Sequence, residues 1–229
     1  MRRNVLALVA LATLVLPVTP VAADTTGGGG TSYHFSQTGN GADAGWSTSP
    51  ADGQLVAGVV YTDTYVSISD QAVKQDGTVY ADKFLFIDQY SYMIDRRGNS
   101  VTVSETVGFA GGTDVALSVN RTLTSASVAA VVSLSTCTAD RRGNGTCVDA
   151  GIGSVDVSWT GQGDVIKQSG TYHVVSKGFS ETSKSRESYR NATASGSLNG
   201  AAIGGQLFSA DIFNASSRDI FICHGPGSC

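Results

Sequence analysis

The sequence predicts an all-β protein, an antiparallel sandwich or barrel of about 10–12 short strands with little or no helix. Apolar and polar residues alternate with period two along several segments, as in strands that bury one face. Residues that favour turns recur about every 8–12 positions, which is the spacing of short antiparallel strands. The chain also contains 28 glycines, and no long segment shows the 3.6-residue apolar period of a helix.

The alternation is clearest in residues 101–109, 115–119, 128–134 and 155–159, and it returns at Ile220 and Ile222. Bulky or β-branched residues between turn signals predict the other strands. These strands are expected at residues 54–61, 64–69, 79–94, 171–176, 186–198 and 201–213. The turns between strands are expected at residues 51–53, 75–77, 97–99, 111–112, 143–145, 161–163 and 199–200.

Residues 1–23 have the pattern of a secretory signal peptide. Arg2 and Arg3 precede an apolar run over residues 5–16, two prolines follow, and residues 21–23 are small enough for a cleavage site. A membrane-spanning helix needs about 20 apolar residues, so the sequence predicts cleavage and no membrane insertion afterwards. The paired arginines leave the twin-arginine export route open. We therefore expect a secreted, extracellular protein, and the composition suggests a bacterial source.

The mature chain is divided by composition. Residues 24–45 are rich in Gly, Thr and Asn and are expected to be a flexible lead-in. Residues 46–229 are expected to form a single β domain, with two small β domains as the alternative. The formal charge of the whole chain is −4, and losing the two signal arginines makes it more negative. This acidic balance argues against a nucleic-acid partner, which would favour a basic patch.

Four cysteines in an exported chain predict two disulfides. We favour the local pairs Cys137–Cys147 and Cys223–Cys229, because each pair closes a short polar loop. Long-range pairing between the two groups is the alternative, and it would tie the C-terminus to the body of the domain.

One five-residue segment occurs twice. Asp-Arg-Arg-Gly-Asn at residues 95–99 returns at residues 140–144, which suggests either a duplicated hairpin or the same turn chemistry used twice. If the two tips are functional, they present pairs of arginines that bind carboxylate or sulfate groups. The candidate ligand-binding arginines are Arg96, Arg97, Arg141 and Arg142.

A second candidate ligand-binding group lies in residues 84–92. Asp88, Tyr90 and Tyr92 share a face with two phenylalanines, because side chains two apart in a strand point the same way. The arrangement fits a core face with an acid at its edge, and this is the reading we favour. It also fits a carbohydrate surface, where aromatic side chains stack on sugars and the carboxylate accepts hydroxyl groups. A catalytic acid at Asp88 is the third reading.

No constellation in the sequence identifies a reaction. The histidines are His34, His173 and His224, and none belongs to a recognisable nucleophile motif. The sequence contains no phosphate-binding or dinucleotide-binding motif and no standard metal spacing, although calcium binding stays open. We therefore expect no catalytic residue, no metal and no cofactor.

The function expected from these observations is non-catalytic. We expect an extracellular binding module whose ligand is a glycan, a component of the cell envelope or a protein. Two alternatives stay open: a secreted hydrolase that uses carboxylate chemistry, and a structural or self-assembling surface protein.

Overall fold

The computed structural model describes residues 30–75, 77–139 and 145–224. These residues form one antiparallel sheet of eleven strands, with the three-residue 3-10 helix η1 (Gly112–Asp114) as the single helix within them. The strands are β1 (Gly30–Ser47), β2 (Val60–Gln75), β3 (Thr78–Ile94), β4 (Ser100–Gly111), β5 (Val115–Val119), β6 (Ser125–Ala139), β7 (Gly145–Gly161), β8 (Ile166–Ser176), β9 (Phe179–Leu198), β10 (Ala201–Ala202) and β11 (Gln206–His224). The predicted all-β fold is confirmed, although most strands are longer than the turn spacing suggested.

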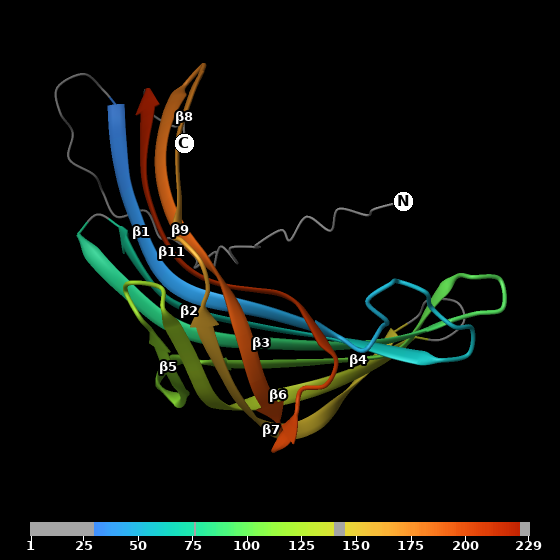
Figure 1. Ribbon diagram of the computed structural model, residues 1–229. Helices are drawn as coiled ribbons and strands as arrows, with labels where there is room; N and C mark the ends of the chain where they lie inside the picture. The colour runs from blue at the N-terminus through green and yellow to red at the C-terminus, as the bar shows by residue number, and fades with distance from the viewer. Residues whose placement is uncertain (1–29, 76, 140–144, 225–229) are drawn as a thin grey trace.

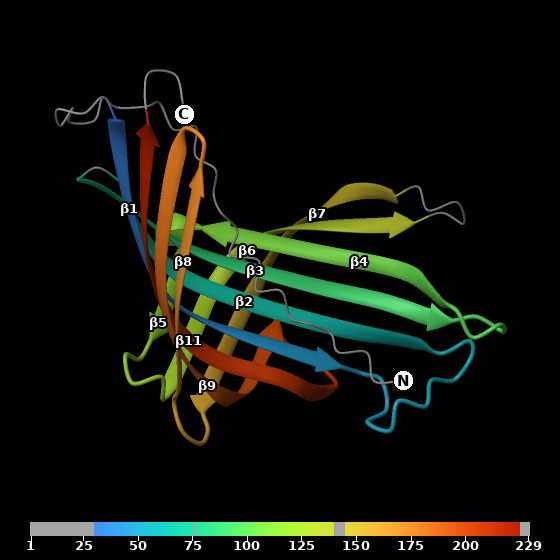
Figure 2. The same cartoon turned by 90° about the horizontal axis from the view of Figure 1, so that it is seen from above.

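The sheet closes on itself into a ring (Figures 1 and 2). Its order runs β9-β11-β1-β2-β3-β4-β6, and β7 joins the ends because it pairs with both β6 and β9. Strand β9 makes this possible because it changes partners along its length. Its first part pairs with β8 and its last part, residues 192–198, pairs with β7. Of the two predicted architectures, this closed ring corresponds to the barrel.

The core fills the inside of the ring. Alternate residues of each strand point inward, so β2 buries Val66 and Ile68 while β3 buries Leu85 and Ile87. Strands β6 and β7 supply the opposite wall. Their buried residues are Ala126, Val128, Val132, Leu134, Val155, Val157 and Trp159. Trp159 also ties the walls together, because its Nε1–H donates to the backbone oxygen of Asp43 at 2.9 Å.

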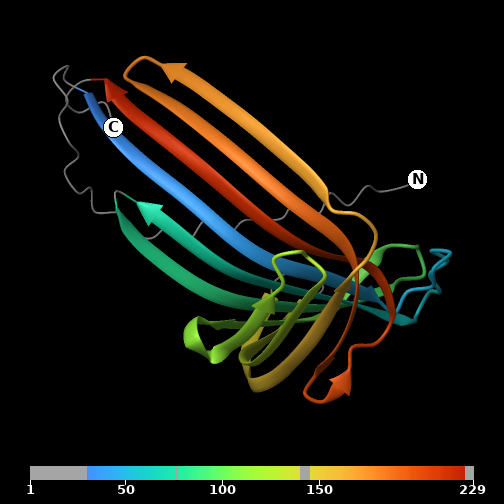
Figure 3. The ribbon, with the colours of Figure 1, turned by 60° about the vertical axis from the view of Figure 1, so that its left-hand side comes forward.

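Beyond the ring, several strands continue as an open extension of the sheet. Strands β1, β11, β9 and β8 run side by side away from β6 and β7, and β1 and β11 bend strongly on the way (Figures 1 and 3). Strong bending and twisting of this kind is usual for long antiparallel strands in closed sheets. In the extension both faces of the sheet are at least partly open, which gives the molecule two broad strand surfaces.

The flexible lead-in expected at residues 24–45 is wrong for residues 30–45. These residues belong to β1, which pairs with β11 from Gly30 to Ser47 and with β2 from Phe35 to Ser47. The glycines that suggested flexibility have a packing role instead. A Cβ added at Gly41 would lie 2.5 Å from Phe213 Cζ, and one added at Gly45 would lie 2.5 Å from Phe208 Cζ. Strand β1 therefore lacks side chains where aromatic side chains cover it.

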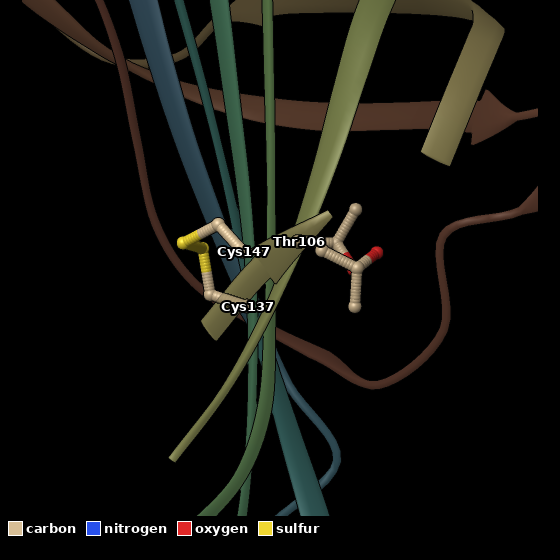
Figure 4. Close-up of a disulfide and its surroundings, with 4 residues drawn as sticks. Thr106, Cys137 and Cys147 are labelled. Carbon is tan, nitrogen blue, oxygen red and sulfur yellow. A yellow bond between two sulfur atoms is a disulfide. The ribbon is translucent and has the colours of Figure 1, made fainter. Parts of the chain in front are cut away.

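The first predicted disulfide is present. Cys137 and Cys147 are cross-strand partners in β6 and β7, and their sulfur atoms are bonded. Figure 4 shows this disulfide on one side of the strands and Thr106 on the other, where its hydroxyl lies 3.0 Å from that of Thr136. Cys223 is buried and is not a free thiol. Its expected partner Cys229 and the signal peptide lie outside the described residues.

Candidate functional site

The aromatic segment of β3 faces away from the core. Leu85 and Ile87 are the buried residues of this segment, so the other set of side chains, to which Phe86 and Asp88 belong, lies on the outside of the ring. The core reading that we favoured for this face is therefore wrong. Both sets are apolar enough to be buried, and the register with β2, which places Ile87 beside Val66, decides between them. We call this side of the sheet the outer face.

Aromatic side chains from four strands gather on the outer face. Phe208 contacts Tyr65 edge-on with ring centroids 5.4 Å apart, and Phe84 stacks on Phe109 at 6.5 Å. Phe86 is the cross-strand partner of Phe109 on β4 and of Ser67 on β2, and it lies on the same face as both pairs. We call these five aromatic residues the outer aromatic strip. The strip is open to solvent, with Tyr65 39%, Phe86 39%, Phe109 55% and Phe208 51% exposed.

Asp88 lies within this strip. It is the cross-strand partner of Tyr65 on β2 and of Val107 on β4. Its Oδ1 is buried and has no hydrogen-bond partner among the residues that the structure describes. Burial, with a smaller effect of the Glu105 carboxylate, raises the pKa of Asp88 to about 6. An unpaired polar group carries a desolvation penalty, so Asp88 contributes an unfilled hydrogen-bond acceptor to the outer face.

The other two candidates from β3 are Tyr90 and Tyr92. Their side chains pack against neighbouring residues and are less exposed than the four exposed side chains of the outer aromatic strip. Their side chains stack at 5.7 Å, and Tyr61 packs on Tyr92 at 5.8 Å. The hydroxyl of Tyr90 lies 2.8 Å from that of Thr102. Burial raises the pKa of Tyr92. The two tyrosines are thus held next to Asp88 by packing, whereas the exposed aromatic surface is supplied by other residues of the same face.

A pair of carboxyl groups lies beside the strip. Asp43 on β1 and Asp211 on β11 are direct cross-strand partners. Burial is the main cause that raises the pKa of both, and the nearby Asp43 and Glu187 contribute to raising the pKa of Asp211 to about 6. Phe213 and Phe208 cover the glycines on either side of Asp43. Sequence patterns do not reveal this pair, because its two members lie 168 positions apart in the chain.

Within the described structure, no candidate arginine lies in this site. Arg96 and Arg97 are exposed at the tip between β3 and β4. Asp95 holds that tip, because its Oδ1 accepts from the backbone N–H of Arg97 at 2.8 Å and of Asn99 at 2.9 Å. These bonds give the Asp and Asn of the repeated segment a structural role as turn residues. Arg141 and Arg142 lie outside the described residues.

The histidines are dispersed. His173 on β8 is exposed, and its Nδ1 lies 2.9 Å from the Thr182 hydroxyl on β9. His34 on β1 is exposed on the opposite face of the sheet from Asp43. The side chain of His224 lies outside the described part of the chain. Among the described residues, no three His, Cys, Asp or Glu side chains form a group that could hold a metal ion.

Within the described ranges, no helix is long and apolar enough to cross a membrane. No protein-family model and no curated protein matches the sequence. One solved structure, titled "an Acetoacetate Decarboxylase-like Enzyme from Sphingomonas wittichii RW1", is similar over 84% of this chain and 91% of its own, with 10% sequence identity and a TM-score of 0.31. A likeness of this degree supports no statement about activity. The function of this chain therefore has to be inferred from its own residues.

Proposed function

We propose that this protein is an extracellular binding module that takes glycans on the outer aromatic strip. The observation that carries the proposal is the buried, unpartnered Oδ1 of Asp88 among solvent-exposed aromatic side chains. A neutral sugar presents apolar C–H faces and hydroxyl groups to a protein. Aromatic side chains bury the first, and a carboxylate oxygen accepts from the second.

The shape and exposure of the strip also support binding. Contiguous exposed apolar surface on a soluble domain marks an interaction site more often than chance. Here the exposed side chains come from β2, β3, β4 and β11, so a rigid paired sheet holds them in place. Acidic residues surround the strip, since Asp63, Glu105 and Asp211 share the outer face. Neutral sugars and amino sugars are the glycans that this charge favours.

The experiment is a pull-down of the mature chain, from Asp24 onward, with insoluble polysaccharides such as chitin and cellulose and with peptidoglycan. We expect the protein in the pellet with at least one of them, and no soluble sugar released. The variants Tyr65→Ala and Asp88→Ala should reduce the bound fraction about tenfold each, because the first removes an aromatic ring and the second removes the carboxylate acceptor. Tyr172→Ala is the matched control, since Tyr172 is a 56% exposed tyrosine on β8, outside the strip.

The proposal is overturned if Tyr65→Ala and Tyr172→Ala bind equally well, or if the wild-type protein stays in solution with every glycan. Far-UV circular dichroism of each variant shows whether the fold is intact. Light scattering on the same samples tests the alternative that the protein assembles with itself, because growing particles in the absence of glycan would indicate self-assembly.

A secreted hydrolase is the second candidate, and the facing carboxyls of Asp43 and Asp211 favour it. Cross-strand partners have Cβ atoms about 5 Å apart, and retaining glycosidases place two carboxyls about 5–5.5 Å apart. Binding remains the preferred function because Asp43 is largely buried and hydrogen-bonds to Ser67. Release of soluble sugar by the wild type, lost in Asp211→Asn, would establish hydrolysis instead.

A further inference from the structure

Charge is separated between the two faces of the sheet. Side chains two apart in a strand lie on one face, so the register assigns every strand charge to a face. The acids of the outer face are Asp43, Asp63, Asp82, Asp88, Glu105, Asp149, Asp156, Glu181, Glu187, Asp211 and Asp219. The cations of the other face are Lys74, Lys83, Lys167, Lys184, Arg186, Arg190 and Arg218. Where this second face extends beyond the ring, we call it the basic face.

The basic face carries a row of cations across neighbouring strands. The register aligns Lys74 on β2 with Ser36 on β1, Ser36 with Arg218 on β11, and Arg218 with Lys184 on β9. Adjacent strands lie about 4.8 Å apart, so three cations span a width of about 15 Å in one line. Arg186 lies two residues from Lys184 on the same face and extends the positive surface along β9. All four cations are exposed.

A cavity lies over this row. It has a volume of about 360 Å³ and is lined by His34, Phe35, Ser36, Lys74, Gly77 and Arg218. Two cations and a hydroxyl at the wall of one cavity are suited to bind an anionic group, since guanidinium and ammonium groups bind phosphate, sulfate and carboxylate through charge-assisted hydrogen bonds. The remaining cations lie outside the cavity and would contact further anionic groups of the same ligand.

Within the described strands, few acids lie near this row of cations. Asp70 is the one acid that the register places on this face within the described strands, and it lies opposite Lys83. Arg190 has a structural partner, because its Nε–H donates a hydrogen bond to the Gly163 backbone oxygen at 2.9 Å. The row formed by Lys74, Arg218 and Lys184 lies away from both residues. In a chain with a formal charge of −4, such a concentration of cations favours an anionic partner.

We propose that the basic face is a second binding site, which takes an anionic polysaccharide lying across the strands. Several cations in a line favour a linear ligand with repeated charges. Serine and threonine side chains between the cations, such as Ser36 and Thr38, offer partners for sugar hydroxyls. Tyr33 and Phe221 of the extension belong to the outer face, and Phe35 is the one aromatic residue, among those that the structure describes, that lines the cavity. A single aromatic residue disfavours single-stranded nucleic acid, whose successive bases stack on several aromatic side chains.

The test is calorimetric titration of the mature chain with polygalacturonate and with dextran sulfate at low ionic strength. We expect binding that weakens as salt is added, because exposed charges are screened. Lys74→Glu combined with Arg218→Glu should lower the affinity at least about tenfold, since it reverses both cations of the cavity. Arg121→Glu combined with Lys177→Glu is the matched control, because these exposed residues lie in turns and the change in net charge is the same.

Three results would overturn the proposal: no binding of either polysaccharide by the wild type, equal loss in both double variants, or tighter binding of a single-stranded oligonucleotide than of both polysaccharides. All four substituted residues are exposed, and thermal unfolding shows whether each variant is folded. Asp88→Ala should bind the anionic polysaccharides as the wild type does, so failure at one face is distinguishable from failure at the other.

Discussion

Asp43 and Asp211 face each other directly across β1 and β11, so two acids share a partly desolvated position on the outer face. Like charges placed opposite each other in a sheet are destabilising. Burial and the neighbouring carboxylates raise the pKa of Asp211 to about 6. The outer face is therefore arranged at a cost in stability near neutral pH, which is typical of functional positions.

Asp211→Asn should stabilise the protein at pH 7.5 and leave its stability unchanged at pH 3.5. The folded-state pKa of Asp211, about 6, is above the ordinary value, so the native state binds the proton more tightly than the unfolded state. The free energy of unfolding therefore falls as the pH rises from about 4 to about 6 and stays low above that. After allowance for solvent screening, the gain at pH 7.5 is about 1 kcal/mol.

Urea unfolding of both proteins at the two pH values measures this difference. The exposed loop variant Asp164→Asn serves as the control and is expected to unfold with the wild type at both. A wild type that is more stable than Asp211→Asn at pH 7.5 would show that the carboxylate is stabilised in the folded protein.

Replacing Cys137 and Cys147 by serine should lower the free energy of unfolding by about 2–3 kcal/mol, because the bridge closes a short loop in the unfolded chain. For a chain of this length the melting temperature should fall by about 5–10 °C. The strands around the bridge remain paired from Ser125 to Ala139, so the circular dichroism spectrum should not change. A melting temperature within 1 °C of the wild type, taken as roughly the precision of a melt, would contradict the prediction.

Gly196→Ala tests the pairing of β7 with β9, which closes the ring. A Cβ at this position would lie 2.5 Å from the Asp156 backbone oxygen and 2.5 Å from Val157 Cγ2. Because a backbone atom cannot move away easily, we expect a loss of about 1–3 kcal/mol in a denaturant titration. Gly204→Ala is the control, since nothing lies within 4 Å of its added Cβ. Equal stability of the two variants would show that β9 shifts to make room.

Trp159→Phe should destabilise the protein by about 1–3 kcal/mol. The substitution removes the hydrogen bond that the indole N–H donates to the Asp43 backbone oxygen, a contribution of about 0.5–1.5 kcal/mol. It also removes part of a fully buried side chain. In native-state hydrogen exchange, the substitution should raise the exchange rate relative to the wild type in β1 near Asp43 and not in β8, which lies outside the ring. Uniform exchange over the chain would indicate that the bond to Asp43 is not what holds β1 locally.

Side-chain alternation in the sequence was enough to predict the fold class. The period-two pattern at residues 155–159 describes Val155, Val157 and Trp159 correctly as inward-facing, because one face of that strand is apolar and the other polar. The Cys137–Cys147 bridge was also predictable, since both cysteines flank a polar loop. The same reasoning failed for β1, where glycines suggested flexibility and in fact lie beneath Phe208 and Phe213.

The sequence by itself determined an antiparallel β protein with a local disulfide, because both depend on patterns within short segments. Only the tertiary structure decided which face of β3 is buried, because Ile87 and Phe86 are both apolar and the register with β2 chooses between them. Tertiary structure also brought Asp43 to Asp211 and Lys74 into line with Arg218. These residues are distant in the chain, and strand pairing across the closed sheet is what makes them neighbours.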